Sequence, residues 1–249
     1  MTGVILAGGF GTRLGKITDK IPKPLIQIGA KPILLHIIDY YKSFEFDKFV
    51  ICAGYLYSLV FESFLEMSEE SKYIDQNVLK TQIDGTEVII VNTGENTGTA
   101  QRLYKVKNYI QGESFALTYA DGLSNINQKE LIKHHFYKNK LVTLSAVHPM
   151  DRFGVITFDD SFIATEFSEK KKRNDCWING GFMILKKDIF NFFDYEDYSL
   201  EKDVLPKLIS ISEVSVYLHE GFWQCMDTKD EHDYLEKLWA SHEAPWASN

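Results

Sequence analysis

A glycine-rich stretch near the N-terminus carries residue types that bind phosphate groups. The apolar run at residues 4–6, typical of a buried strand, leads into the glycines of residues 8–11. Glycines there permit positive φ angles, let a ligand approach the backbone, and expose successive N–H groups that can bind an anion. Thr12 adds a hydroxyl, Arg13 a planar fork of donors, and Lys23, between two prolines, a second positive charge. The stretch therefore predicts a polyphosphate site at the C-terminal end of the first strand.

The spacing of this stretch excludes two common phosphate-binding loops. The Rossmann fingerprint needs three glycines, and Leu14 stands where the third would follow Gly9 and Gly11. A P-loop needs a glycine five residues before the glycine-lysine pair that ends in Lys16, and Phe10 stands there instead. An ordinary glycine-rich turn remains the alternative, and the arginine and the Pro-Lys-Pro segment that follow make it the weaker interpretation.

Two aspartates are candidate metal ligands. Asp121 follows the strand-like residues 115–119, and Asp227 follows the apolar and aromatic residues that begin at Phe222. Carboxylates on neighbouring strand ends suit Mg²⁺, a hard cation that shares its oxygen ligands with phosphates. The alternative is that each aspartate is a turn or helix-capping residue, and Asp227, followed by Thr228 and a helical pattern, fits that alternative as well.

Alternating strand and helix patterns predict the frame that positions these residues. Strands separated by helices of ten or more residues indicate βαβ units and a mainly parallel sheet, in which ligands bind at the carboxyl ends of strands. Asp84 and Gly85 predict a hairpin turn. Residues 68–72 read as a polar connector and residues 168–175 as a basic loop. The expected strands are 4–6, 48–53, 77–83, 86–91, 115–119, 141–147, 153–159, 162–167, 178–185 and 214–219, and the expected helices are 31–44, 55–67, 100–110, 128–137, 199–210 and 229–241.

Composition restricts the class of protein. The 249 residues are 45% hydrophobic and 25% charged, as in soluble globular proteins. A net charge of −8 argues against non-specific nucleic-acid binding. Three cysteines without a C-x-x-C spacing predict neither a disulfide framework nor a zinc site. The absence of a signal-like start and of any run of about 18 apolar residues predicts a cytoplasmic protein that does not contact membranes.

Taken together, the motifs resemble those of the sugar-phosphate nucleotidylyltransferases. That family carries L-A-G-G-x-G-T-R-L followed by P-K-P, which residues 6–14 and 22–24 match. Within it, the glucose-1-phosphate cytidylyltransferases are the most similar, because residues 221–228 (GFWQCMDT) follow their late motif G-F-W-Q-P-M-D-T. The resemblance runs from residue 1 to the C-terminus, and the further matched segments are 99–103, 118–122, 152–154, 169–171, 179–182 and 244–246.

The resemblance implies a fold and a reaction. The fold would be a Rossmann-like nucleotidyltransferase fold of the glycosyltransferase-A kind, α/β, with a mainly parallel central sheet flanked by helices and small β additions. Residues 1–249 would form a single domain, in which residues 1–150 bind the nucleotide and residues 151–249 serve the acceptor and oligomerisation. The protein would transfer CMP from CTP to a phosphorylated small molecule, release pyrophosphate, and form a homo-oligomer. Such transfer needs no protein nucleophile, only positioning and charge neutralisation.

The resemblance also implies roles for individual residues. Arg13, Lys23, Asp121 and Asp227 would be catalytic, and both aspartates would bind Mg²⁺. The nucleotide would contact Leu6, Ala7, Gly8, Gly9, Gly11, Thr12, Arg13, Lys23, Thr97, Arg102 and Ala120. The acceptor would contact Glu169, Lys170, Asn179 and Gly180.

Departures from the family pattern cluster on the acceptor side. A family glycine becomes Ala120, a glycine pair becomes residues 100–101 (Ala-Gln), and a proline becomes Lys171 within the basic run 170–173. That run is either a solvated loop or part of a remodelled acceptor pocket. Extra bulk beside Asp121 favours an acceptor other than glucose 1-phosphate, such as phosphoglutamine in a bacterial capsule pathway. The alternative is a glucose-1-phosphate cytidylyltransferase that makes CDP-glucose.

Two further classes compete with this interpretation. A glycosyltransferase of the related fold would want a D-x-D metal motif, which residues 121–123 (DGL) lack. A catalytically silent CTP-binding regulatory subunit should have lost a catalytic residue. Because Arg13, Lys23 and both aspartates are present, the sequence favours the enzyme.

Overall fold

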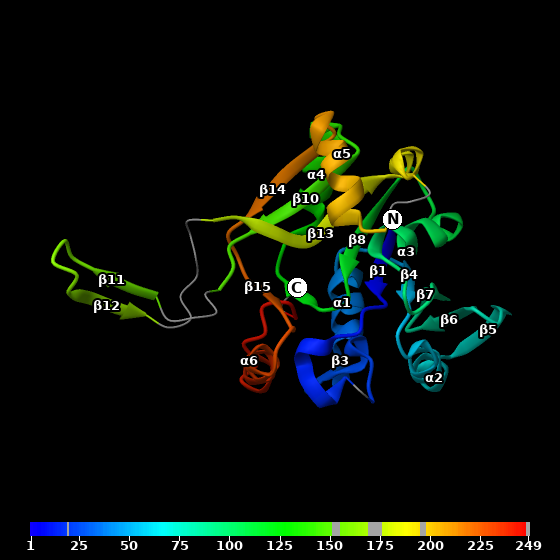
Figure 1. The fold of residues 1–249 in the computed structure, drawn as a ribbon. Coiled ribbons are helices and arrows are strands. Elements are labelled where there is room, and N and C mark those ends of the chain that lie inside the picture. The colour runs from blue at the N-terminus through cyan, green and yellow to red at the C-terminus, as the bar shows by residue number, and fades with distance from the viewer. Residues whose placement is uncertain (19, 151–154, 169–175, 195–197, 248–249) are drawn as a thin grey trace.

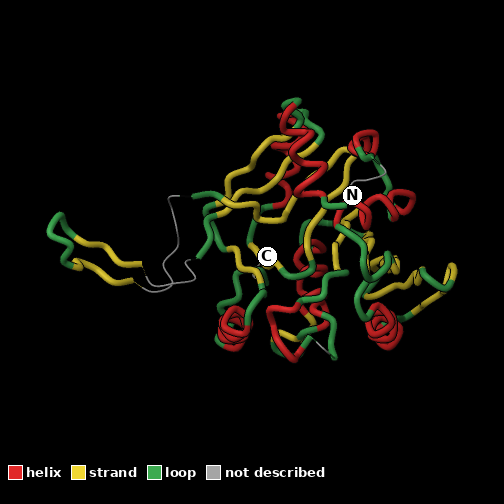
Figure 2. The backbone as a smooth tube through the Cα atoms, viewed as in Figure 1, coloured by secondary structure: helices red, strands yellow, loops and turns green. Residues whose placement is uncertain are grey.

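The computed structural model of the chain describes residues 1–18, 20–150, 155–168, 176–194 and 198–247. Within these residues, one large sheet is flanked by helices on both faces (Figures 1 and 2). The expected α/β fold with a mainly parallel central sheet is confirmed.

Nine strands of the described chain form the sheet. In chain order they are β1 (Thr2–Ala7), β4 (Lys48–Ala53), β5 (Glu70–Asp75), β6 (Val78–Ile83), β7 (Thr86–Asn92), β8 (Ser114–Tyr119), β10 (Val142–Val147), β13 (Ile178–Lys186) and β14 (Val214–His219). Their order across the sheet is β14-β10-β13-β8-β1-β4-β7-β6-β5. Strands β7, β4, β1 and β8 at the centre are parallel, whereas β13 and β6 pair with their neighbours in antiparallel fashion.

The first strand lies in the middle of the sheet and is buried on both faces. Its residues alternate between two hydrophobic cores: Ile5 packs in one, and Val4 and Leu6 pack in the other. This explains the continuous apolar run, because a parallel strand covered on both faces has no polar side. Leu6 lies opposite Cys52 of β4 and Tyr119 of β8. The carboxyl ends of these three strands therefore meet at one edge of the sheet.

Helices cover the two faces according to the core that they complete. The first core receives residues from α1 (Ile33–Lys42), α2 (Tyr57–Met67), α4 (Gln128–Lys138) and α6 (Lys229–Ala240). The second core receives residues from α3 (Thr99–Lys105) and α5 (Leu205–Ser210).

Small elements complete the fold. The expected small β additions are present as two-stranded pairs: β2 (Gln27–Ile28) with β3 (Lys31–Pro32), β9 (Gly122–Ser124) with β15 (Trp223–Cys225), and β11 (Val155–Phe158) with β12 (Ala164–Ser168). Short 3-10 turns span Thr12–Ile17, Lys23–Leu25, Lys107–Tyr109 and Lys187–Phe192, and a π-helical turn spans Leu200–Val204.

The hairpin turn between β6 and β7 is confirmed. Asp84 has φ of 48° and Gly85 has φ of 71°. A two-residue turn with positive φ at both positions matches the twist of the flanking strands, which is why Asp-Gly predicts it.

Some sequence expectations were wrong in detail. The polar connector at residues 68–72 is largely strand β5, an edge strand whose mostly exposed side chains conceal its backbone pairing with β6. The single helix expected at 100–110 ends at Lys105 and continues only as a 3-10 turn. The helix expected at 199–210 begins as a π-helical turn, and Pro206, which has no N–H to donate, follows at the start of α5.

Hairpin β11–β12 extends away from the sheet (Figure 1). It exposes large apolar side chains, with Phe162 83% exposed and Phe167 63% exposed. The motif at 152–154 and all of the basic loop except Ser168 lie outside the described residues, as do the predicted acceptor residues Glu169 and Lys170. None of the helices in the described ranges has both the length and the apolar character needed to span a bilayer.

Candidate active site

Four charged side chains from three separate parts of the sequence converge at the sheet edge, and we call them the charged centre: Arg13, Lys23, Asp121 and Asp227. The Lys23 Nζ donates to Asp121 Oδ2 and to Asp227 Oδ1, each at 2.6 Å. The Arg13 Nη1 donates to Asp227 Oδ2 at 2.6 Å. The structure thus brings together all four residues that the resemblance nominated as catalytic, and their catalytic roles stay predictions.

A short strand pair brings the two aspartates together. Asp121 immediately precedes β9. One residue, Met226, separates the end of β15 from Asp227. These strands pair with Gly122 opposite Cys225, and the Met226 N–H donates to the Asp121 carbonyl at 2.8 Å. A strand of three residues carries too little periodicity to be found in sequence, yet this pair sets the spacing of the two carboxylates.

Asp227 is not the cap of the helix that follows it. The N-cap of α6 is Thr228, whose hydroxyl accepts from the Glu231 N–H at 3.3 Å. Glu231 Oε2 in turn accepts from the backbone N–H groups of Asp227 and Thr228, at 2.7 and 2.8 Å. This capping box fixes the backbone at Asp227 and leaves its carboxylate to Lys23 and Arg13.

Lys23 remains positively charged in this setting. Burial alone would lower the pKa of Lys23, but the charges and hydrogen bonds of Asp121 and Asp227 outweigh it and raise the pKa above its usual value. Its turn is defined by prolines on either side, and the Leu25 N–H donates to the Pro22 carbonyl at 2.8 Å. The lysine is therefore a fixed cation, whereas the Arg13 side chain is 64% exposed at the mouth of the site.

The three loop glycines lie in three different surroundings. Gly11 has φ of +65° and precedes the turn that carries Arg13. A Cβ at Gly9 would meet no atom within 4 Å, so its backbone is open to a ligand. A Cβ at Gly8 would lie 2.1 Å from Arg102 Nη1, which makes glycine necessary there for a protein contact.

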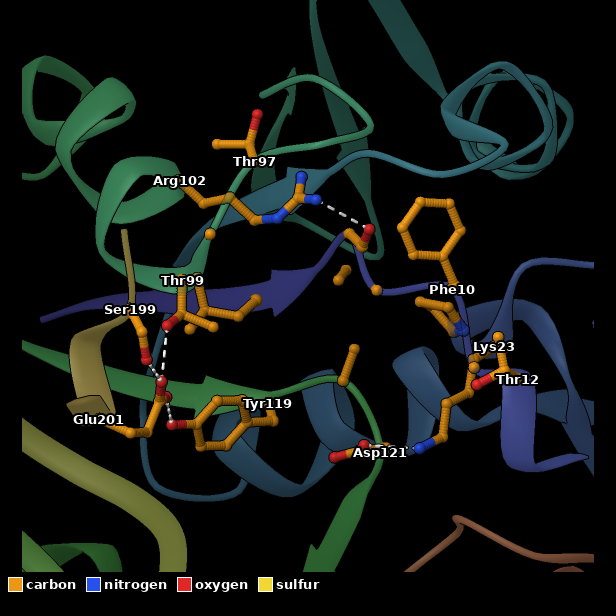
Figure 3. Close-up of a pocket in the computed structure, with 18 of the residues that line it drawn as sticks. Phe10, Thr12, Lys23, Thr97, Thr99, Arg102, Tyr119, Asp121, Ser199 and Glu201 are labelled. Carbon is orange, nitrogen blue, oxygen red and sulfur yellow. Dashed lines mark hydrogen bonds and ion pairs between the residues drawn. The ribbon is translucent and has the colours of Figure 1, made fainter. Parts of the chain in front are cut away.

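Arg102 is buried and bonds to the loops rather than pointing into open space (Figure 3). Burial lowers the pKa of its guanidinium, but an arginine stays charged in proteins. A Cβ at Gly54 would also clash with it, at 2.2 Å. Nucleotide contact by Arg102 stays a prediction; what the structure adds is a positioning role. Its guanidinium donates to the carbonyls of Gly8 (2.9 Å), Ala53 (3.3 Å), Gly94 (2.7 Å) and Glu95 (3.0 Å) and to the hydroxyl of Thr93 (2.6 Å).

A cleft of about 500 Å³ contains the charged centre. Every residue expected to contact the nucleotide lines it, including Thr97 and the buried Ala120. Asn179 and Gly180, expected at the acceptor, lie in β13 outside this lining. Sequence reasoning missed ten further lining residues. Four of them stand inside matched motifs but were given no role: Phe10, Pro24, Thr99 and Tyr119. The other six lie outside those motifs and reach the cleft only through the fold: Glu95, Gly98, Tyr198, Ser199, Glu201 and Lys202.

A family model described as nucleotidyl transferase matches residues 2–240. The chain belongs to the nucleotidyl transferase family. The match spans both the glycine-rich loop and Asp227, so the charged centre lies wholly within the nucleotidyltransferase region. The chain is accordingly an enzyme of the nucleotidyltransferase class.

Relatives align with the nucleotidyltransferase over nearly its whole length. A glucose-1-phosphate cytidylyltransferase of Salmonella typhi is 36% identical over 254 residues, covering 99% of this chain and 98% of the relative. A probable glucose-1-phosphate cytidylyltransferase of Bacillus subtilis is 36% identical and covers 99% of both chains. The resemblance to sugar-phosphate nucleotidylyltransferases, and to glucose-1-phosphate cytidylyltransferases within them, is confirmed.

Solved structures confirm the nucleotidyltransferase fold. HddC from Yersinia pseudotuberculosis, complexed with GMP-PN, superposes with a TM-score of 0.72 at 22% identity and covers 96% of this chain and 99% of its own. A putative glucose-1-phosphate thymidylyltransferase from Bacillus anthracis gives a TM-score of 0.70 at 18% identity and covers 96% and 95%. At these identities the likeness concerns the fold alone.

Proposed function

We propose that this nucleotidyltransferase transfers CMP from CTP to the phosphate of a small-molecule acceptor and releases pyrophosphate. The observation that carries the proposal is the convergence of Lys23, Asp121, Asp227 and Arg13 in a cleft beneath the glycine-rich loop. The choice of CTP is supported by relatives at 36% identity that are named cytidylyltransferases.

In the proposed reaction an oxygen of the acceptor phosphate attacks the α-phosphorus of CTP. The bond from that phosphorus to the bridging oxygen of the β-phosphate breaks, and pyrophosphate leaves with the electron pair. Lys23 neutralises charge on the phosphates near the reacting phosphorus, and Arg13 holds the departing end at the mouth of the cleft. No side chain needs to form a covalent intermediate, because positioning and charge neutralisation suffice.

Asp121 and Asp227 fit a magnesium ion as ligands. Their Oδ2 and Oδ1 atoms both lie 2.6 Å from the same Lys23 Nζ, so the two carboxylates converge on one point. Among the described residues no cluster of three or more His, Cys, Asp or Glu side chains has the arrangement of a metal site. Mg²⁺ is commonly held by one or two carboxylates together with substrate phosphates, and when bound it supplies charge neutralisation on phosphate oxygens.

Removing divalent metal should therefore stop the reaction. We expect excess EDTA to abolish pyrophosphate release and added Mg²⁺ to restore it, because the carboxylates alone repel the triphosphate. The measurement is the rate of pyrophosphate release as a function of Mg²⁺ concentration. A rate that EDTA leaves unchanged would show that the two aspartates serve Lys23 and not a metal.

For the acceptor, we propose a phosphorylated molecule other than glucose 1-phosphate, such as phosphoglutamine, used in bacterial capsule or surface-polysaccharide synthesis. Ala120, beside Asp121 in the cleft lining, supports the change. Gln101 does not, because its Oε1 accepts from the Gly98 N–H at 3.4 Å as part of the α3 cap. Synthesis of CDP-glucose is the second candidate, favoured by the names of the relatives at 36% identity.

A panel of acceptors separates these two candidates. Enzyme, Mg²⁺ and CTP are mixed with glucose 1-phosphate or with amidophosphates, and pyrophosphate release is measured. We expect release to be faster with an amidophosphate. Robust formation of CDP-glucose would reject the altered acceptor and favour the second candidate.

We also propose that the enzyme works as a homo-oligomer. Hairpin β11–β12 supports this, because it exposes Phe158, Phe162 and Phe167 to solvent in the single chain.

A further inference from the structure

One carboxylate in the cleft has no part in the proposed reaction. Glu201 lies in the π-helical turn Leu200–Val204 and lines the cleft. In this turn the Val204 N–H bonds to the Ser199 carbonyl at 3.4 Å, five residues back. Such turns are rare and occur frequently at functional sites. Figure 3 shows Glu201 on the opposite side of the view from Lys23.

Three hydroxyl groups, from β8, from α3 and from the residue that caps the π-helical turn, hold the Glu201 carboxylate. Its Oε2 accepts from Thr99 Oγ1 at 2.7 Å and from Ser199 Oγ at 2.8 Å, and its Oε1 accepts from the Tyr119 hydroxyl (Figure 3). Tyr119 ends β8, and Thr99 begins α3. All three donors are neutral, and none of the ion pairs between described side chains includes Glu201.

The carboxylate is ionised despite its burial. Burial opposes the charge, but the hydrogen bonds from Tyr119, Thr99 and Ser199 outweigh it and hold the pKa of Glu201 below its usual value. Burial, together with the charge of Glu201, raises the pKa of Tyr119 well above its usual value, so the tyrosine stays a donor.

The bonding of Glu201 leaves acceptor capacity. An ionised carboxylate offers about four lone-pair sites. Oε2 accepts from two hydroxyls and Oε1 from one, that of Tyr119, while the Glu201 backbone N–H also stabilises the charge. The cleft therefore has cations at Lys23 and Arg13, where phosphates would bind. The fixed carboxylate of Glu201 favours a donor group over a phosphate oxygen in direct contact with it, although Lys202 also lines the cleft.

Glu201 lies where the expected nucleotide and acceptor regions meet. Thr99 follows the loop that carries Thr97, expected at the nucleotide. On the other side, a Cβ at Gly181 would lie 2.7 Å from Tyr119 Cδ2, and Asn179, expected at the acceptor, is close enough to oppose the rise in the pKa of Tyr119. A donor group on either substrate can therefore face the carboxylate.

We propose that Glu201 determines substrate specificity by accepting a hydrogen bond from an N–H or O–H group of a bound substrate. The donor is the amino group of cytosine or a donor group on the acceptor molecule, and a carbonyl or phosphate oxygen at the same place is rejected. The inference rests on the proposed function and adds to it the kind of group that this end of the cleft selects.

Glu201→Gln tests the proposal, because glutamine has the same shape, its carbonyl oxygen can still accept from Thr99 and Ser199, and the Tyr119 hydroxyl can accept from its amide. Its amide also presents an N–H, so it no longer rejects an acceptor atom. In the nucleotide arm, the affinities of CTP and UTP are measured by calorimetry without any acceptor molecule. If cytosine is the source of the donor, the preference for CTP falls by about 10- to 100-fold, the worth of one hydrogen bond to a charged group.

In the acceptor arm, the KM of the acceptor is measured at saturating CTP, and a rise of about 10- to 100-fold identifies the acceptor as the source. Asp203→Asn is the matched control. Asp203 accepts from the Tyr198 and Ser199 N–H groups on the same turn, at 3.0 and 2.7 Å, but lies outside the cleft lining. If the Glu201→Gln variant does not fold, Glu201→Asp is used instead in both arms. Aspartate is shorter by one methylene and withdraws the carboxylate from the substrate.

The proposal is overturned if both the CTP preference and the acceptor KM stay within about twofold of the wild type, or if Asp203→Asn changes them as much. A wild-type protein that binds neither nucleotide refutes the proposed function itself. Binding with an unchanged preference and an unchanged acceptor KM refutes only the role of Glu201.

Discussion

Replacing Lys23 with alanine is expected to lower kcat for pyrophosphate release by on the order of 10²–10³ or more, with the protein still folded. The substitution removes a fixed cation and also leaves the carboxylates of Asp121 and Asp227 without the group that both now contact at 2.6 Å. Asp227→Asn should have a similar effect, because it weakens the contacts of Asp227 to Lys23 and Arg13. The measurement is steady-state pyrophosphate release, with a thermal melt of each variant.

Lys80→Ala is the matched control for the lysine substitution. Lys80 also forms an ion pair, with its Nζ 2.5 Å from Glu87 Oε2. Unlike Lys23, it lies on strand β6, outside the cleft lining. It should leave turnover unchanged. Near-normal release from Lys23→Ala would refute the catalytic role of the charged centre.

Arg102→Ala is expected to have the largest effect on stability, lowering the free energy of unfolding by about 3 kcal/mol. The substitution deletes the donors to four carbonyls and one hydroxyl and leaves a cavity beneath Gly8 and Gly54. In a chain of this length, that loss corresponds to a melting temperature lower by about 6–12 °C. Urea unfolding and a thermal melt measure it directly.

Arg13→Ala distinguishes the role of Arg13 in turnover from the role of Arg102 in stability. Because the Arg13 side chain is 64% exposed, its loss should change stability by less than about 1 kcal/mol while lowering turnover. Arg102→Lys should recover only part of the stability, since an ammonium group cannot present the planar fork. An Arg102→Ala variant as stable as the wild type would show that the loops do not depend on the guanidinium.

Much of the fold and of the charged centre could be predicted because those features have local signals. The buried run before Gly8, the Asp84-Gly85 turn and the apolar periodicity of the helices all follow from neighbouring residues. Arg13 and Lys23 carry their chemistry within one short motif. Asp121 and Asp227 were found as strand-end carboxylates, and the β9–β15 pair that joins them was not.

The features that escaped prediction depend on contacts across the fold. Edge strand β5 has no apolar face, so only its backbone pairing reveals it. Glu201 looked like an ordinary helix residue, because its partners Thr99 and Tyr119 lie 102 and 82 positions away in the sequence. Arg102 gave no sign that glycines elsewhere make room for its guanidinium.

The most direct test of the proposed reaction follows the α-phosphate of CTP. Wild-type enzyme, Mg²⁺, a phosphorylated acceptor and CTP labelled at the α-phosphorus are combined, and the labelled products are separated and weighed by mass spectrometry. The expected result is a single labelled product in which CMP is joined to the acceptor phosphate, with one pyrophosphate per product and no labelled protein. Three results would contradict direct transfer at the charged centre: the label remains in CTP, it appears as free CMP without any acceptor adduct, or it becomes attached to the protein.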